Sequence, residues 1–130
     1  MRLQTGIITQ KLEETSRFFV EHFGFREKFT SEWFILLHAP ASEANELAIM
    51  LPDQPQVRLA GFQKPYGGSG VWLILESDSV TADYDRLRGA GLPIELALTE
   101  EEWGDTHFVV RDPNGILVDI VQRREVGHEA

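Results

Sequence analysis

One carboxylate, Asp119, lies inside a run of strand-forming residues near the C-terminus, Leu117-Val118-Asp119-Ile120-Val121. Successive side chains of a strand point to opposite faces, so Asp119 shares a face with Leu117 and Val121 and lies opposite Val118 and Ile120. If the two opposite residues pack in the core, Asp119 must face water, a cavity or a partner. In a cavity it would recognise a cation, and elsewhere it would be a solvated or ion-paired strand residue.

Aromatic and histidine side chains supply the other candidates for ligand contact. Trp72 and Trp103 would offer large faces for stacking, or would only fill space and pack at a rim. His38 and His107 fall on equivalent predicted strands, and they would hold a metal with Asp119 if they approached each other. The sequence contains no His-x-His or His-x-x-x-His pair, so we favour a site without a metal.

No pattern in the sequence identifies a catalytic group. There is no nucleophile elbow, phosphate-binding loop or dinucleotide fingerprint. The chain has no cysteine, which excludes a thiolate nucleophile or thiolate metal ligand. No acid–base pair stands at a convincing spacing, so we assign no catalytic residue and favour binding over catalysis.

The composition indicates one globular domain that does not bind polyanions. The chain has 130 residues, of which 42% are hydrophobic and 25% charged, as in ordinary globular domains. Its formal net charge of −9 argues against nucleic acids and against anionic membrane surfaces as partners. The N-terminus lacks the apolar core of a signal peptide, and no run approaches the length that spans a membrane. We therefore expect a cytoplasmic protein.

The same order of elements, one strand, one helix and three strands, is predicted twice. Each helix has an apolar face and stops near a glycine, Gly24 or Gly91. Residues 52–70, with three prolines and four glycines, form a linker between the copies. Asp112-Pro113-Asn114-Gly115 forms a tight turn between the last two strands. The first copy is predicted as strand 4–9, helix 12–23 and strands 25–30, 33–38 and 47–51, and the second as strand 71–76, helix 80–90 and strands 93–98, 106–111 and 116–122.

This repeat has a physical consequence for where a ligand would bind. One such unit covers one face of its sheet with its helix and leaves the other face bare. Two units can shield each other's bare faces, so a cavity between them is the expected functional surface. The side chains that alternate along each strand with those packed under the helix should line this cavity.

Two segments of the chain, LQTGIITQKLEETSRFFVEHFGF and WGDTHFVVRDPNGILVDIVQ, carry a resemblance to a known family. The first resembles the opening and the second the closing hairpin of modules in the vicinal oxygen chelate superfamily, which contains glyoxalases, bleomycin-resistance proteins and extradiol dioxygenases. The resemblance covers essentially the whole chain, with the linker as the least typical part. It implies the paired fold but not a reaction, because the superfamily contains isomerases, dioxygenases, thiol transferases and metal-free drug binders.

The resemblance also implies where a metal would be held. Metal-dependent members carry one ligand on the first and last strand of each module, usually His, Glu or Gln. By position, Gln4 matches the first ligand and Asp119 the last. Ala48 falls at the second position, or Met50 after a two-residue slip, and Trp72 falls at the third. An indole and a methyl group cannot complete a divalent site, so the resemblance implies a site without a metal.

We therefore predict a single α+β domain over residues 1–130, with module 1 at about 1–51, module 2 at about 71–122 and a tail at 123–130. The two βαβββ modules would form a half-closed, eight-stranded barrel-like sheet around a cavity. The cavity would sequester a small neutral or cationic organic molecule without a metal or other cofactor, as in the bleomycin-resistance branch. Its candidate ligand-binding residues are Gln4, Met50, Trp72, Trp103 and Asp119.

Two other functions remain as alternatives. One is a metal-dependent glyoxalase-like lyase, isomerase or dioxygenase whose ligands have moved. The other is a module that mainly dimerises with or regulates another protein. Family members commonly complete their cavities by dimerising, so the resemblance also implies a homodimer.

Overall fold

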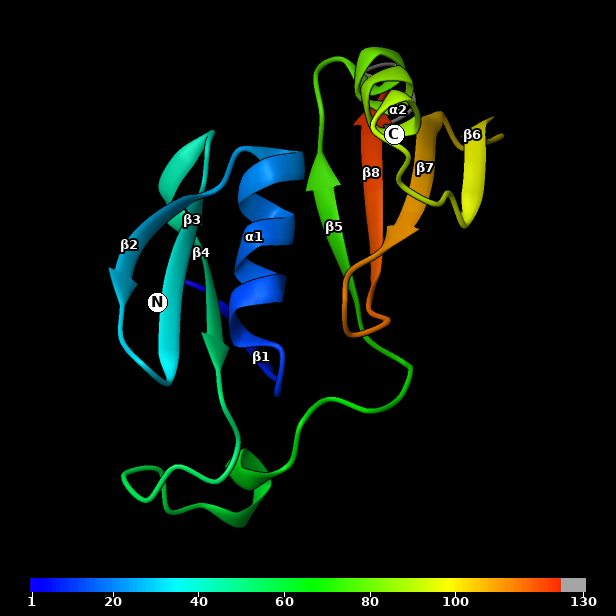
Figure 1. Ribbon diagram of the computed structural model, residues 1–130. Coiled ribbons are helices and arrows are strands. Elements are labelled where there is room, and N and C mark those ends of the chain that lie inside the picture. Colours follow the sequence, from blue (N-terminus) through cyan, green and yellow to red (C-terminus); the bar gives the residue numbers. More distant parts are fainter. Residues whose placement is uncertain (125–130) are drawn as a thin grey trace. The chain divides into compact units, whose positions relative to one another are not determined.

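The protein contains two copies of one βαβββ unit, seen in a computed structural model that describes residues 1–124 (Figure 1). The chain divides into two compact units, the first spanning Met1–Gly68 and the second starting at Ser69. The predicted α+β fold with a repeated unit is confirmed. The first unit contains β1 (Thr5–Ile8), α1 (Leu12–Phe23), β2 (Arg26–Thr30), β3 (Phe34–Ala39) and β4 (Ser42–Met50). The second contains β5 (Trp72–Glu76), α2 (Val80–Gly89), β6 (Leu96–Glu100), β7 (Asp105–Arg111) and β8 (Leu117–Arg123).

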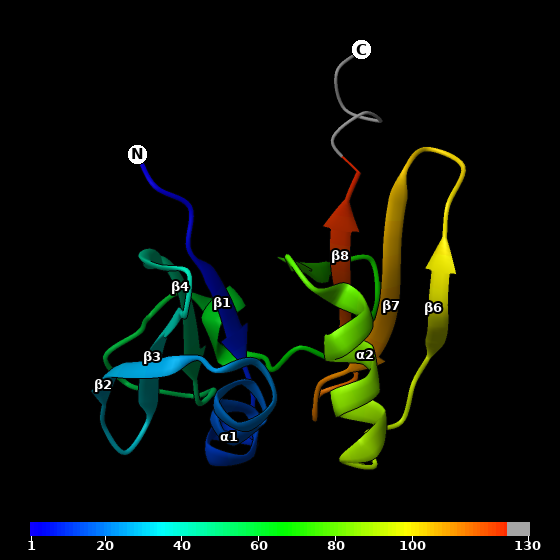
Figure 2. The same ribbon diagram turned by 90° about the horizontal axis from the view of Figure 1, so that it is seen from above.

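Each unit contains a four-stranded sheet in which the first strand lies beside the last. The strand orders are β1-β4-β3-β2 and β5-β8-β7-β6. β1 pairs in parallel with β4 and β5 with β8, whereas the other neighbours are antiparallel. One helix lies against each sheet (Figure 2): α1 packs on β3 and β4, and α2 on β7 and β8. The two sheets are not closed into the barrel-like sheet that we expected. In the described part of the chain, neither helix is long and apolar enough to cross a membrane.

The core of the first unit lies between α1 and its sheet. Phe19 of the helix, Leu37 of β3 and Ile49 of β4 have no exposed surface. The helix ends where Gly24 adopts a φ of 72°, a left-handed conformation that a residue without Cβ tolerates. The N–H of Gly24 donates to the carbonyl of Val20 at 3.2 Å. The helix therefore ends at the residue that the sequence predicted.

The core of the second unit lies between α2 and its sheet. Leu87 of the helix, Phe108 and Val110 of β7, and Val118 of β8 are completely buried. The rings of Tyr84 and Phe108 meet edge to face, with 5.1 Å between their centroids. Val118 thus packs in the core, as the alternating pattern around it predicted.

Two strands, β4 and β6, differ from their predicted ranges by more than one residue at an end, and the predicted tail also differs. β4 starts at Ser42 rather than at residue 47, because backbone pairing with β3 does not require apolar side chains. β6 is Leu96–Glu100 rather than 93–98, and its last residue pairs with Thr106 of β7. The predicted tail begins later than expected, since Arg123 still belongs to β8. Its residues 125–130 lie outside the described part of the chain.

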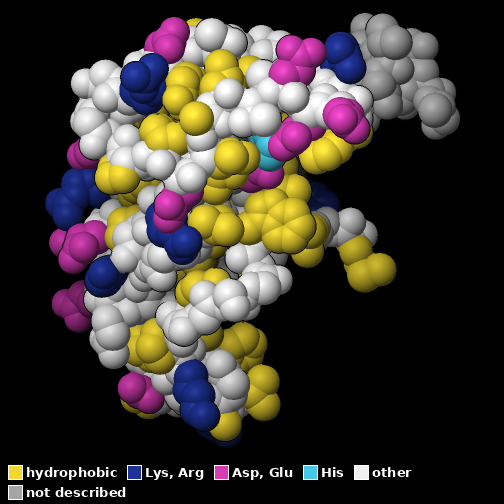
Figure 3. Space-filling model, turned by 90° about the vertical axis from the view of Figure 1, so that its right-hand side faces the viewer, with side chains coloured by type: hydrophobic (Ala, Val, Ile, Leu, Met, Phe, Trp, Pro, Cys, Tyr) yellow, Lys and Arg dark blue, Asp and Glu magenta, His cyan; other side chains and the backbone are white. Residues whose placement is uncertain are grey.

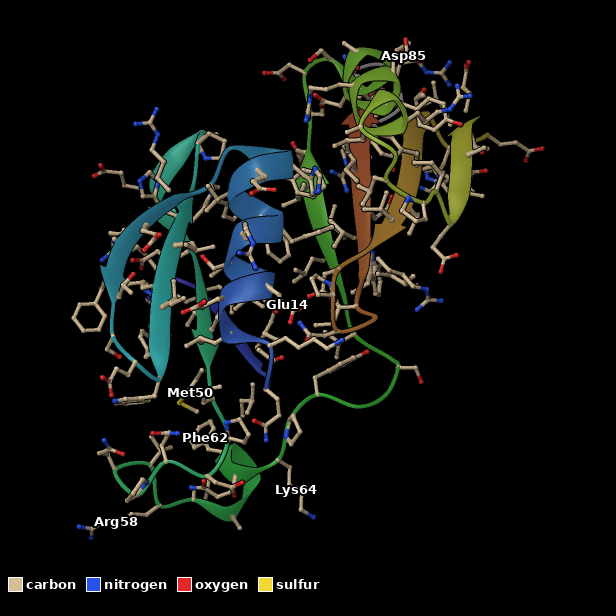
Figure 4. The ribbon with its side chains drawn as sticks, viewed as in Figure 1. Glu14, Met50, Arg58, Phe62, Lys64 and Asp85 are labelled. Atoms are coloured by element: carbon tan, nitrogen blue, oxygen red, sulfur yellow. The ribbon has the colours of Figure 1, made fainter. Side chains whose placement is uncertain are left out.

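The predicted linker, residues 52–70, stays in contact with β1. The N–H of Tyr66 donates to the carbonyl of Ile8 at 2.9 Å. The segment also forms one turn of 3-10 helix at Ala60–Gln63. Phe62 of this turn is labelled in Figure 4 and is 46% exposed. Residues 52–68 of the predicted linker therefore belong to the first unit.

Candidate functional site

The second sheet has one face covered by α2 and an opposite face that carries the predicted site residues. Side chains that alternate with the buried Val118 belong to this opposite face. Strand pairing places Trp72 beside Leu117 and Ile74 beside Asp119. Trp72 is 54% exposed and Ile74 is 46% exposed, so apolar surface surrounds the carboxylate. We call this surface the open face of the second sheet: Trp72, Ile74, His107, Val109, Leu117 and Asp119.

A histidine is held between two carboxylates on this face. His107 Nδ1 lies 2.7 Å from Asp119 Oδ1, and His107 Nε2 lies 2.8 Å from Glu101 Oε2. Ionised carboxylates only accept hydrogen bonds, so both contacts are hydrogen bonds together when the ring is an imidazolium ion that donates from both nitrogens. We call Glu101, His107 and Asp119 the histidine clamp. Asp119 is thus ion-paired within the protein, as in one of the alternatives that the sequence left open.

The environment of the clamp raises the pKa of His107 above its ordinary value of 6.5. Partial burial alone would lower this pKa, because it disfavours the charged ring. Hydrogen bonds to Glu101 and then to Asp119, with the charges of both carboxylates, outweigh that effect. The side chain of His107 is 13% exposed, so these contacts are only partly screened by water.

The clamp forms because three separate segments meet on one side of the sheet. His107 pairs with Thr99 of β6 on one side and Val121 of β8 on the other. Asp119 is two residues before Val121 and therefore on the same face. Glu101 follows β6 in a tight turn, where its N–H donates to the carbonyl of Asp105 at 2.8 Å. Glu101 was not among the residues that the sequence indicated, because its contact depends on the shape of this turn.

Trp103 lies in the same turn between β6 and β7. It is 60% exposed, and its indole N–H donates to Asp105 Oδ2 at 3.2 Å. This bond orients the indole while most of its surface faces solvent. The structure therefore places Trp103 and Glu101, which are neighbours in one turn, at the same end of the second sheet.

Other charges near the clamp are paired with one another. Arg123 donates to Glu76 at 2.8 Å, and Arg124 lies 3.4 Å from Glu100. Arg123 and Arg124 are therefore engaged with carboxylates outside the clamp. In the space-filling view, acidic side chains lie around a histidine, with hydrophobic side chains next to them (Figure 3).

The first unit contains the other two predicted site residues. The side-chain amide of Gln4 donates to Glu46, which also accepts from Lys28 at 2.9 Å. The hydrogen bond from Lys28 lowers the pKa of Glu46, more than burial raises it. Met50 is half-buried and pairs with Phe34 of β3.

Glu46 is the second residue that sequence reasoning missed. From the sequence, the second metal-ligand position was assigned to Ala48, or to Met50 if the alignment is shifted by two residues. The register instead aligns Ala48 with Gly6, and Glu46 is the residue that Gln4 contacts. Glu46 lies two residues before Ala48 and shares its face. The alternation of side chains along the strand could therefore have indicated Glu46 as a candidate.

The predicted site residues thus fall into two groups. Gln4 and Met50 lie in the first unit, and Trp72, Trp103 and Asp119 lie in the second. The structure brings Asp119 together with His107 and Glu101, which were not in the predicted set. A cavity shared by both groups stays a prediction.

The residues at the four metal-ligand positions do not fit a divalent metal. Trp72 has no lone pair to donate, and Glu46, which takes the place assigned to Ala48, already accepts from Gln4 and Lys28. The amide nitrogen of Gln4 is engaged with Glu46, and both ring nitrogens of His107 are engaged with carboxylates. Within residues 1–124, no three His, Cys, Asp or Glu side chains group in a way that could hold a metal ion.

Comparison with known proteins defines the family. A model of the Glyoxalase/Bleomycin resistance protein/Dioxygenase superfamily matches residues 3–120, and the chain belongs to this superfamily. Curated proteins from Mycobacterium bovis and Mycobacterium tuberculosis, both described as uncharacterized, are 36% identical over 83 residues. That match covers 62% of this chain, 54% of the first relative and 48% of the second. The chain therefore spans about half the length of the curated relatives it matches.

Solved structures share the fold over nearly the whole chain. A lactoylglutathione lyase from Agrobacterium tumefaciens has 16% identity and a TM-score of 0.73, covering 94% of this chain and 92% of its own. TioX from Micromonospora sp. ML1 has 18% identity and a TM-score of 0.71, covering 95% and 99%. A superfamily member from Sphaerobacter thermophilus has 21% identity and a TM-score of 0.74, covering 95% and 97%. At these identities the similarity shows the fold alone.

We expect the stability that His107 contributes to fall as the pH rises. Its raised pKa means that the folded state binds the proton more tightly than the unfolded state, whose histidine has the ordinary value of 6.5. The contribution is therefore complete below that value and is lost as the pH passes through the higher folded pKa. Urea unfolding of wild type and His107→Gln between about pH 5.5 and 8.5 measures this difference. A stability difference that stays constant with pH would contradict it.

Proposed function

We propose that the protein binds a small organic molecule, neutral or cationic, on the open face of the second sheet without a bound metal. The observation that carries the proposal is the exposed apolar surface of Trp72, Ile74 and Leu117 beside the carboxylate of Asp119. Exposed apolar surface with a few polar groups at its centre is typical of ligand sites. Indole faces would stack on the ligand and attract a cation, and the carboxylate would accept a hydrogen bond from it.

Contributions from Gln4 and Met50 belong to the same proposal. Gln4 would contribute a polar amide and Met50 a thioether to ligand binding. The homodimer and the absence of a stoichiometric metal are proposed with it. The metal-dependent lyase, isomerase or dioxygenase is not favoured by any contact described above.

The first test separates a metal-free binder from a metal enzyme. Protein purified without chelator should contain no stoichiometric divalent metal, and adding chelator should leave its melting temperature unchanged. Thermal shift against small aromatic cations and their neutral analogues should then show stabilisation, because a ligand that binds only the folded state stabilises it. One tightly held metal per chain, removed by chelator with a fall in melting temperature, would refute the metal-free proposal.

Trp72→Ala should weaken binding without affecting folding. Removing the indole face should cost about 1–2 kcal/mol of binding free energy for an aromatic ligand. The loss of stability should be small because the side chain is 54% exposed. Phe62→Ala is the matched control, since Phe62 is an exposed aromatic of the linker. Equal affinity of the Trp72→Ala variant and wild type for every ligand found would exclude the indole from the site.

A further inference from the structure

We propose that Glu101 is a specificity-determining residue, which gives the histidine clamp one net negative charge and makes the open face of the second sheet select ligands with a single positive charge. This inference rests on the proposed function and adds to it a residue and a class of ligand. The preferred ligand would be an organic ammonium ion attached to an aromatic or apolar group.

The charge follows from the geometry of the clamp. Two carboxylates contribute two negative charges, and a ring that donates from both nitrogens contributes one positive charge. The sum is one negative charge spread over Glu101 and Asp119. Without Glu101, the pair of His107 and Asp119 would be neutral and would attract a cation much less.

Asp119 keeps one carboxylate oxygen for a ligand. Within residues 1–124, His107 is the hydrogen-bond partner of Asp119 and engages its Oδ1. Oδ2 of Asp119 is therefore left to accept from an ammonium group. The side chain of Asp119 is 17% exposed, so a charge there is screened less than at an open surface.

The neighbouring charges do not cancel this preference. On the same face, Arg123 of β8 is paired with Glu76 of β5, and Asp105 of β7 accepts the indole N–H of Trp103. α2 packs on β7 and β8 from the opposite face of the sheet. Exposed Trp72 and Ile74 lie on the other side of Asp119, where the apolar part of the ligand would rest.

The test compares benzylammonium with benzyl alcohol, which have similar shapes and differ in charge. Their dissociation constants are measured by tryptophan fluorescence and by NMR shifts at about pH 5.5, where a histidine beside even one carboxylate stays protonated. Wild type should prefer benzylammonium. Glu101→Gln should reduce that preference by about tenfold, the effect of one partly screened charge. Glu102→Gln changes the total charge equally at the next, exposed position, and should reduce the preference less than about twofold.

A second variant should change the preference for benzylammonium in the opposite direction. His107→Gln removes the positive charge while keeping a hydrogen-bond donor, so it should increase the preference for benzylammonium. This variant keeps the inference testable if Glu101→Gln does not fold. Unchanged preference in both variants, with both probes still bound, would overturn the inference and leave the proposed function standing. Binding of neither probe to wild type would overturn the proposed function and this inference together.

Discussion

Replacing Phe108 by alanine is expected to lower the free energy of unfolding by about 3–5 kcal/mol. Phe108 has no exposed surface and meets the ring of Tyr84 edge to face at 5.1 Å between centroids. Truncation removes the transfer free energy of a whole ring and leaves a cavity between β7 and α2, which rigid neighbours fill only in part. Urea denaturation, followed by circular dichroism, measures the loss.

Phe29→Ala is the matched control for this substitution. Phe29 lies on β2 of the first unit and is 55% exposed, with its ring 6.2 Å from that of Phe34. Its truncation should cost less than about 1 kcal/mol, because an exposed ring has little transfer free energy to lose. Similar losses for both phenylalanines would show that burial in the second unit does not determine its stability.

The second large effect is expected for Asp112→Ala, at about 1–3 kcal/mol of unfolding free energy. Asp112 is only 5% exposed and begins the turn between β7 and β8. Its Oδ1 accepts from the backbone N–H of Asn114 at 2.8 Å and of Ile116 at 2.9 Å. The variant leaves the buried N–H of Ile116 without this acceptor, and the turn loses the bonds that fix its shape.

A carboxylate without such bonds provides the comparison. Asp85 is exposed on α2 (Figure 4), and Asp85→Ala should change the unfolding free energy by less than about 0.5 kcal/mol. Asp112→Asn keeps one side-chain oxygen and should lie between the two alanine variants. If Asp112→Ala were as stable as Asp85→Ala, the turn would be held by its backbone alone.

Features that depend on local sequence were predictable from the residues. The range Leu12–Phe23 was predicted exactly as α1 forms it, because its apolar spacing and Gly24 both act within the helix. Asp112 and Gly115 marked the closing turn, and Gly115 does adopt a left-handed φ of 84°. The alternating pattern along β8 predicted that Val118 is buried, because side chains point to opposite faces in turn along any strand.

The partners of Asp119 and Gln4 could not be predicted in the same way. The contact between Asp119 and His107 joins two strands and depends on their register and on the reach of both side chains. Glu101 depends in addition on the turn after β6, and that strand's range was itself predicted wrongly. Glu46 required the parallel register between β1 and β4, which no local pattern specifies. Registers between distant strands are set by packing of the whole unit.

The pairing of first strand with last determines when each unit can form during synthesis on the ribosome. β1 can pair only after β4, which ends at Met50, has been synthesised. β5 can pair only after β8, which ends at Arg123, has been synthesised. Contacts so distant along the chain form slowly, because a long loop must close before they add stability. The first sheet can be complete while the second is still being translated. A nascent chain halted before β8 would carry one finished sheet and one opening strand without its neighbour, and such an unpaired edge is a target for proteases and for aggregation.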